Sequence, residues 1–101
     1  MQRSAELAQP HYVSETQILR RVARNPGCRF IWTRHALVEV KKDGRSTLDV
    51  EHALTNGRVI LHEIKQDLLW RVIGNDLDGR RVQVVVAVDE EEIAIKMVTT
   101  F

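Results

Sequence analysis

A histidine and two cations, far apart in the sequence, are the side chains whose types could perform a reaction together. His35 lies in the expected first turn of a helix, directly after Arg34. The helix N-terminus and this neighbouring cation disfavour a second positive charge, so His35 is a candidate proton acceptor. Arg71 and Lys96 lie on expected strands, and each could stabilise phosphate charge. Attack of an RNA 2′-hydroxyl on its phosphate needs a base, a cation and an acid.

These residues also have a structural interpretation. His35 could hydrogen-bond to the sheet and fasten its helix to a strand, because polar groups near a core are usually satisfied. The strands carry four polar side chains that would form a basic concavity beside His35 if they shared one sheet face: Arg71, Arg81, Gln83 and Lys96. They would otherwise be ordinary residues of the wet face that antiparallel sheets commonly have.

The sequence has no familiar metal or nucleotide motif, so we expect no metal and no cofactor. No two of its four histidines have the i, i+4 spacing of a helical metal site. The single cysteine, Cys28, excludes an internal disulfide and a cysteine-rich zinc site. Trp32 and Trp70 could stack on bases, but both lie in apolar segments, which favours core packing. Gly74, inside an expected strand, predicts a bulge or a close backbone approach.

Positive charge is concentrated in the first part of the chain. Residues 1–45 carry nine Lys/Arg and four Asp/Glu, whereas residues 46–101 carry six and ten. Such a surface attracts polyanions, although exposed helix faces are often basic without binding any. The residues expected to attract RNA, whatever its sequence, are Arg20, Arg21, Arg24, Arg34, Lys41 and Lys42.

Three helices are expected in the first half of the 101-residue chain. Residues 1–13 are polar and predict a flexible arm, which leaves residues 14–101 as a single domain. Ser14–Gln17 matches a capping box that opens the first helix. The short apolar segment at 30–32 could form a brief strand, and after it Thr33 is the expected N-cap of the second helix. A third helix begins at Ser46 or Thr47, and each helix ends at a glycine-containing turn.

Alternating hydrophobicity begins near residue 58 and predicts strands. Short connections join the four expected strands, which favours an antiparallel meander: 58–64, 68–75, 80–88 and 92–100. The helices should cover the more apolar sheet face, giving an α+β fold. No apolar run approaches membrane-spanning length, and the N-terminus has no signal-peptide core, so a cytoplasmic location is expected.

Several short motifs, in this order, resemble a family of small bacterial domains of unknown function. Thr33–Ala36 is similar to its Thr-x-His-Ala opening, and a Gly/Arg turn follows at 43–46. An Asp-Val helix ending in glycine follows at 49–57. Arg71–Gly74 and Asp78–Arg80 resemble an Arg-Val-x-Gly strand and an Asp-Gly-Arg hairpin. A threonine near the C-terminus, Thr99 or Thr100, completes the pattern.

This family is similar to the RelE/BrnT-like toxins of toxin–antitoxin pairs, and more distantly to MqsR-type toxins. The resemblance implies helices on a curved antiparallel sheet, ribosome-dependent or free mRNA cleavage without a metal, and neutralisation by a cognate antitoxin. It places His35 and Arg71 at recurrent polar positions. The leading hypothesis is therefore a toxin-like endoribonuclease. The competing hypothesis is a non-catalytic module that binds protein or nucleic acid through the basic N-terminal half.

Overall fold

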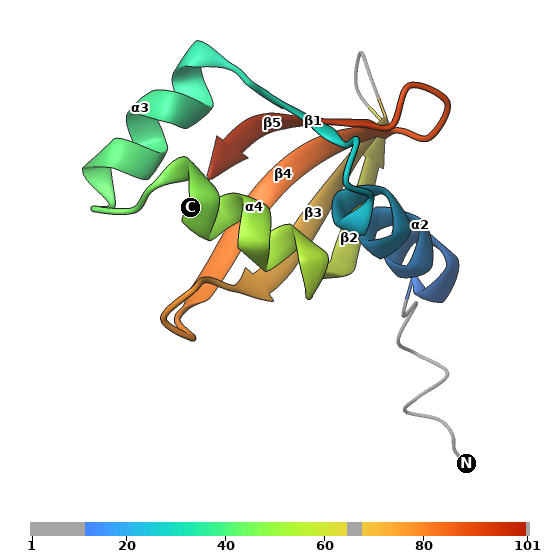
Figure 1. Ribbon diagram of the computed structural model, residues 1–101, viewed down its shortest axis with the longest axis horizontal. Helices are drawn as coiled ribbons and strands as arrows, with labels where there is room; N and C mark the ends of the chain where they lie inside the picture. Colours follow the sequence, from blue (N-terminus) through green and yellow to red (C-terminus); the bar gives the residue numbers. More distant parts are fainter. Residues whose placement is uncertain (1–11, 65–67, 101) are drawn as a thin grey trace.

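The computed structural model describes residues 12–64 and 68–100. In that part of the chain, helices lie on one side of a five-stranded sheet, so the predicted α+β class is confirmed (Figure 1). The predicted arm, residues 1–13, lies outside the described residues as far as residue 11. The elements are α2 (Val13–Arg24), β1 (Arg29–Trp32), α3 (Arg34–Lys42), α4 (Thr47–Thr55), β2 (Arg58–Ile64), β3 (Leu68–Asn75), β4 (Arg81–Asp89) and β5 (Ala94–Thr100).

The sheet has the order β1-β5-β4-β3-β2. Strands β2 to β5 form the predicted antiparallel meander. The prediction of a four-stranded antiparallel sheet is nevertheless wrong, because β1 adds a fifth strand parallel to β5 and makes the sheet mixed. Arg29 pairs with Ala94 and Trp32 with Met97. A four-residue segment is too short to reveal a period, and its partner lies at the other end of the chain.

Local capping explains where the helices begin. The Thr33 side chain accepts a hydrogen bond from the Ala36 N–H, as predicted, and Ser46 forms a capping box with Asp49. The predicted capping box at Ser14 is wrong. Helix α2 begins at Val13, with Tyr12 as the N-cap two residues before Ser14 and without a side-chain cap, so residue 13 of the predicted arm is helical. The Thr16 hydroxyl of its first turn instead accepts a hydrogen bond from the backbone N–H of Val59 on β2.

All three helices pack on the same sheet face. In Figure 1, α2 and α4 lie in front of the sheet, and α3 lies at the left, where it packs on β5. The fully buried core joins residues of the helices to every second residue of the strands: Leu19, Ala36, Val50, Leu54, Val72, Val82, Val84, Val86, Ile95 and Met97. No helix of the described residues covers the other side of the sheet, which we call the open face.

Helix α4 approaches β3 closely at Gly74, as the glycine in this strand predicted. A Cβ atom there would collide with the main-chain oxygen of Ala53. Next to this contact, the Asn56 side chain accepts a hydrogen bond from the Asn75 N–H at 2.9 Å and donates one to the Asn75 carbonyl at 3.1 Å. The end of α4 is thereby fixed to the end of β3.

None of the described helices is long and apolar enough to cross a membrane.

Candidate functional site

The open face gathers the polar strand residues that the sequence singled out. Trp70 and Val72 of β3 point into the core, so Arg71 between them points to the open face. The same alternation on β4 turns Arg81 and Gln83 outward. On β5 it turns Lys96 outward between two fully buried neighbours. These four side chains therefore lie on one face of the sheet.

Two further cations lie on the open face and were not predicted as part of a site. Phe30 and Trp32 of β1 pack against the core, which turns Arg29 outward. Arg58 at the start of β2 pairs with Ile73, an open-face residue of β3. The alternation of Phe30 and Trp32 could have identified Arg29, but only if segment 30–32 had been assigned to the sheet.

Arg71 and Lys96 lie on either side of β4. Arg71 pairs with Val85 and Lys96 pairs with Ala87, two residues further along the same strand. Standard strand spacings place the two Cα atoms roughly 12 Å apart. Both side chains are long, so their charged ends can converge on one phosphate group above Val85 and Ala87. The surface between them is small and apolar.

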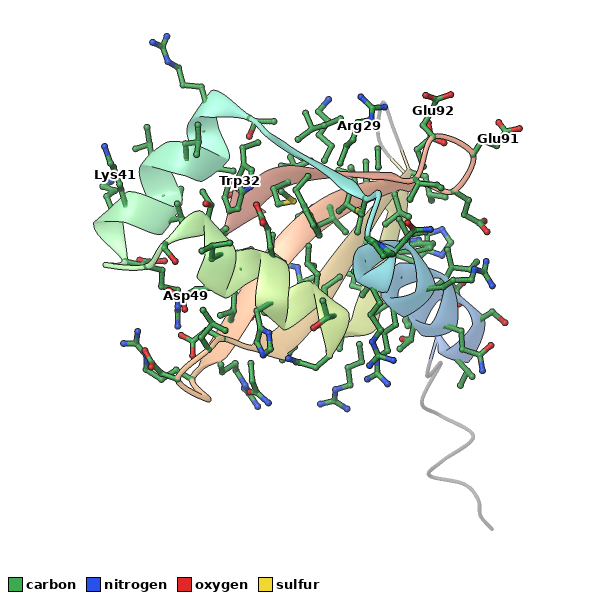
Figure 2. All side chains as sticks on the ribbon, in the orientation of Figure 1. Arg29, Trp32, Lys41, Asp49, Glu91 and Glu92 are labelled. Atoms are coloured by element: carbon green, nitrogen blue, oxygen red, sulfur yellow. The ribbon has the colours of Figure 1, made fainter. Side chains whose placement is uncertain are left out.

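One end of the open face is acidic. Near the β4–β5 turn the face deepens into a hollow of about 550 Å³, whose lining includes Lys96, Arg29 and the acidic residues of the turn. Arg29 lies 3.5 Å from Glu92 in an ion pair (Figure 2). The Glu92 carboxylate therefore offsets the charge of Arg29 at this end of the open face.

His35 is not beside these cations. It is exposed near the start of α3. Helix α3 packs into the core through Ala36 and Val40, on the face of the sheet opposite Arg71. The prediction that the basic residues of the strands lie beside His35 is therefore wrong, because the sheet separates the helix layer from the open face.

The arginines of α2 are engaged with the protein itself. The Arg20 Nε donates a hydrogen bond to the Gly57 carbonyl at 2.8 Å, and the Arg24 Nε donates one to the Thr55 carbonyl at 2.8 Å. They meet the carbonyl end of α4, where cations are stabilising. Arg21 forms an ion pair with Glu90 at 2.8 Å.

The cations of α3 differ from those of α2. Arg34, Lys41 and Lys42 are exposed, and no carboxylate of the described residues lies within ion-pair distance of them. The residues that we expected to attract RNA thus fall into two groups. The arginines of α2 bind other parts of the protein, whereas the cations of α3 are exposed.

Neither tryptophan lies on the open face. Trp70 is in the core, as the apolar context predicted. Trp32 is half-buried and points towards α4 (Figure 2), where its Nε1 donates a hydrogen bond to Glu51 at 2.9 Å. Cys28 also packs against the core, and burial, followed by the charge of Glu51, raises the pKa of its thiol. A thiol with a raised pKa is a poor nucleophile.

A buried carboxylate organises the β3–β4 hairpin. The Asp76 side chain is fully buried and accepts hydrogen bonds from the backbone N–H groups of Asp78 and Arg80. Arg45 and Arg80 pair with it at 3.3 and 3.4 Å. Carboxylate oxygens of Asp49, Asp76 and Asp78 lie within 4.8 Å of one another. Arg45 and Arg80 offset the charge of Asp76, and Asp49 caps helix α4 together with Ser46, so these carboxylates have structural roles.

Residues 32–101 match the family model of a domain of unknown function, DUF4258. The matched range contains the Thr33–Ala36 motif and every strand except most of β1, while α2 lies before it. The expectation of a domain-of-unknown-function family is confirmed. The relation to RelE/BrnT-like toxins stays a prediction. No curated protein and no solved structure matches the sequence.

Proposed function

We propose that this chain, which belongs to the DUF4258 family over residues 32–101, is a toxin-like endoribonuclease that holds RNA on the open face of its sheet. The observation that carries the proposal is the placement of Arg71 and Lys96 on that face, one strand to either side of β4. A guanidinium and an ammonium group at this separation can grip one phosphate. The apolar floor between them suits a ribose or the face of a base.

Binding and cleavage have different support within this proposal. RNA binding is supported by the open-face cations, since phosphate contacts provide most sequence-independent affinity. Cleavage, and neutralisation by a cognate antitoxin, rest on the resemblance to RelE/BrnT-like toxins. Arg71 and Lys96 would stabilise the charge that develops on the phosphate. For His35 to act as the base, the RNA would have to pass round the edge of the sheet to α3.

The separation of His35 from Arg71 favours a second candidate function, a non-catalytic RNA-binding module. Such a module would use the same open face but need no proton acceptor there. Among the described residues, no histidine lies on that face. His35 and His52 are exposed on helices, and His62 contacts Trp70 on the core side. The two candidates differ only in whether bound RNA is cut.

A charge-removal experiment tests the binding site. We expect the double variant Arg71→Gln, Lys96→Gln to bind single-stranded RNA roughly tenfold more weakly and to reduce the slope of log affinity against log salt by about one per lost contact. The matched control is Arg34→Gln, Lys42→Gln, which removes two exposed cations from α3 on the other layer. Fluorescence anisotropy at several salt concentrations measures both. Equal losses in the two variants would contradict an open-face site.

Induced expression in a bacterial host, followed by mapping of RNA ends, separates cleavage from binding. We expect new RNA ends and growth inhibition that the open-face double variant abolishes. Salt-sensitive binding without new ends would assign the protein to the non-catalytic candidate. His35→Ala is the further variant: loss of cleavage with unchanged RNA affinity would give His35 the role of base, and unchanged cleavage would remove that role.

A further inference from the structure

The outward side of α3 carries an apolar pair between cations. Arg34, Leu37, Val38 and Lys41 have the i, i+3, i+4, i+7 spacing of one helix face. The opposite side of α3 is the one that enters the core. Leu37 is 42% exposed and Val38 is 50% exposed, so the pair is uncovered in this structure. A short helix that is apolar on two sides has one side left for another partner.

A hollow gives this surface the shape of a binding groove. Its volume is about 430 Å³, and it lies between the outward face of α3 and the connection to α4, which contributes Arg45, Ser46 and Thr47. We call it the α3 groove. Figure 2 shows Lys41 projecting from this helix away from the sheet. The groove is thus separate from the open face.

The charges around the α3 groove are available for a partner. Arg34 and Lys41 are at the ends of the apolar pair, and Lys42 follows. None of these three cations has a carboxylate within ion-pair distance among the side chains that the structure describes. Arg45 provides the contrast, because it is bound to Asp76 and donates a hydrogen bond to the Arg81 carbonyl at 2.7 Å.

We propose that the α3 groove is a docking site for an acidic amphipathic segment of a partner protein. Such a segment would bury leucine-like side chains against Leu37 and Val38 and place carboxylates beside Arg34 and Lys41. A second copy of this chain fits less well, because a two-fold contact would bring like charges together. RNA also fits less well, because aliphatic side chains offer no aromatic surface for stacking. The proposal requires neither RNA binding nor cleavage.

Titration of the isotope-labelled full chain with synthetic peptides tests this site by NMR. The probe is a helical peptide with leucines on one face and glutamates beside them. One comparison peptide replaces each glutamate by lysine, and another replaces each leucine by serine. We expect saturable shifts in α3 and in residues 43–47 with the acidic peptide alone, weakened by salt.

Matched variants show whether the apolar pair is responsible. We expect Leu37→Ser, Val38→Ser to weaken binding of the acidic peptide by about tenfold or more. Val13→Ser is the control, because Val13 is 60% exposed on α2 and does not line the α3 groove. The amide spectrum of each variant shows whether its fold is intact.

Several outcomes would overturn the proposal. These are equal binding of the lysine peptide, no loss on changing Leu37 and Val38, or shifts confined to the open face. Self-association of the chain that the double variant abolishes would assign the groove to a second copy. RNA-induced shifts centred on α3 would assign it to nucleic acid. Because the charge variants of Arg71 and Lys96 leave α3 unchanged, failure of the RNA proposal can be distinguished from failure of this one.

Discussion

The contribution of the buried Asp76 carboxylate to the stability of the fold depends on pH. Burial alone would raise its pKa, but hydrogen bonds from the Arg80 backbone and the Arg45 guanidinium outweigh burial. The pKa therefore lies below the ordinary value of 3.8. A carboxyl with a lowered folded-state pKa stabilises the fold above its unfolded pKa. That stabilisation disappears as the pH falls through the folded pKa. Asp76 should thus contribute to stability at neutral pH and not in strong acid.

We expect Asp76→Asn to lower the melting temperature at pH 7, because Arg45 would lose its buried counter-charge. The difference from the original protein should begin to shrink as the pH falls below about 4, because the carboxyl of the unfolded chain protonates there, and it should disappear as the pH falls through the lower pKa of the folded state. Asp78→Asn is the control, since the Asp78 side chain is 75% exposed in the same hairpin. Thermal unfolding across a pH series measures both variants. A difference that does not change with pH would contradict the role of the charge.

Gly74 is a second position where one residue type is required. We expect Gly74→Ala to destabilise the protein by about 1–3 kcal/mol, because the added methyl group meets the Ala53 main-chain oxygen, which cannot rotate away. Gly27→Ala is the matched control, since only the Asn25 side chain lies near its added Cβ atom, at 3.3 Å. Urea unfolding gives both free energies. Similar values for the two variants would show that α4 can move away from β3.

Helix α2 precedes the residues that match the family model, yet it packs on the same core. Leu19 is fully buried in the common core, and Thr16 reaches β2. Its arginines cap the carbonyl end of α4, so they contribute to helix–helix contact in addition to surface charge. Whether such an arginine binds RNA or holds α2 depends on a partner that lies far away in the sequence.

We expect Arg20→Ala to destabilise the protein by about 1–2 kcal/mol, because it leaves carbonyls of residues 56 and 57 without their charged donor. Arg21→Ala should change the free energy of unfolding by less than about 0.5 kcal/mol, because its ion pair with Glu90 is exposed. Chemical denaturation compares the two variants. A larger effect for Arg21 would reverse this assignment of roles.

For the molecule as a whole, the alternation of apolar and polar residues along a strand predicts which side chains share a sheet face. The period-2 pattern of residues 80–88 placed Gln83 on the opposite side of β4 from Val82 and Val84, and the structure confirms this. The same pattern required the helices to cover the Val82 face. A histidine on one of those helices therefore cannot share a face with Gln83. The predicted concavity beside His35 joined two expectations that do not fit in one molecule.

Contacts between distant segments were not predictable from local pattern. Arg20 is an ordinary exposed helix residue by its spacing, and only the packed structure brings it to Gly57. The parallel pairing of β1 likewise depends on β5, and residues 29–32 contain no signal of it. Arg29 lies on the open face because β1 pairs with β5. This part of the candidate site could therefore be identified only once the sheet was known.

The position of β5 between β1 and β4 has a consequence for translation. Arg29 leaves the exit tunnel early, but its partner Ala94 is among the last described residues to be synthesised. The nascent chain can therefore form its helices and the β2–β4 meander while β1 still has no neighbour, and contacts of such long range form slowly. A stalled or shortened product that ends before residue 94 would expose the edges of both β1 and β4.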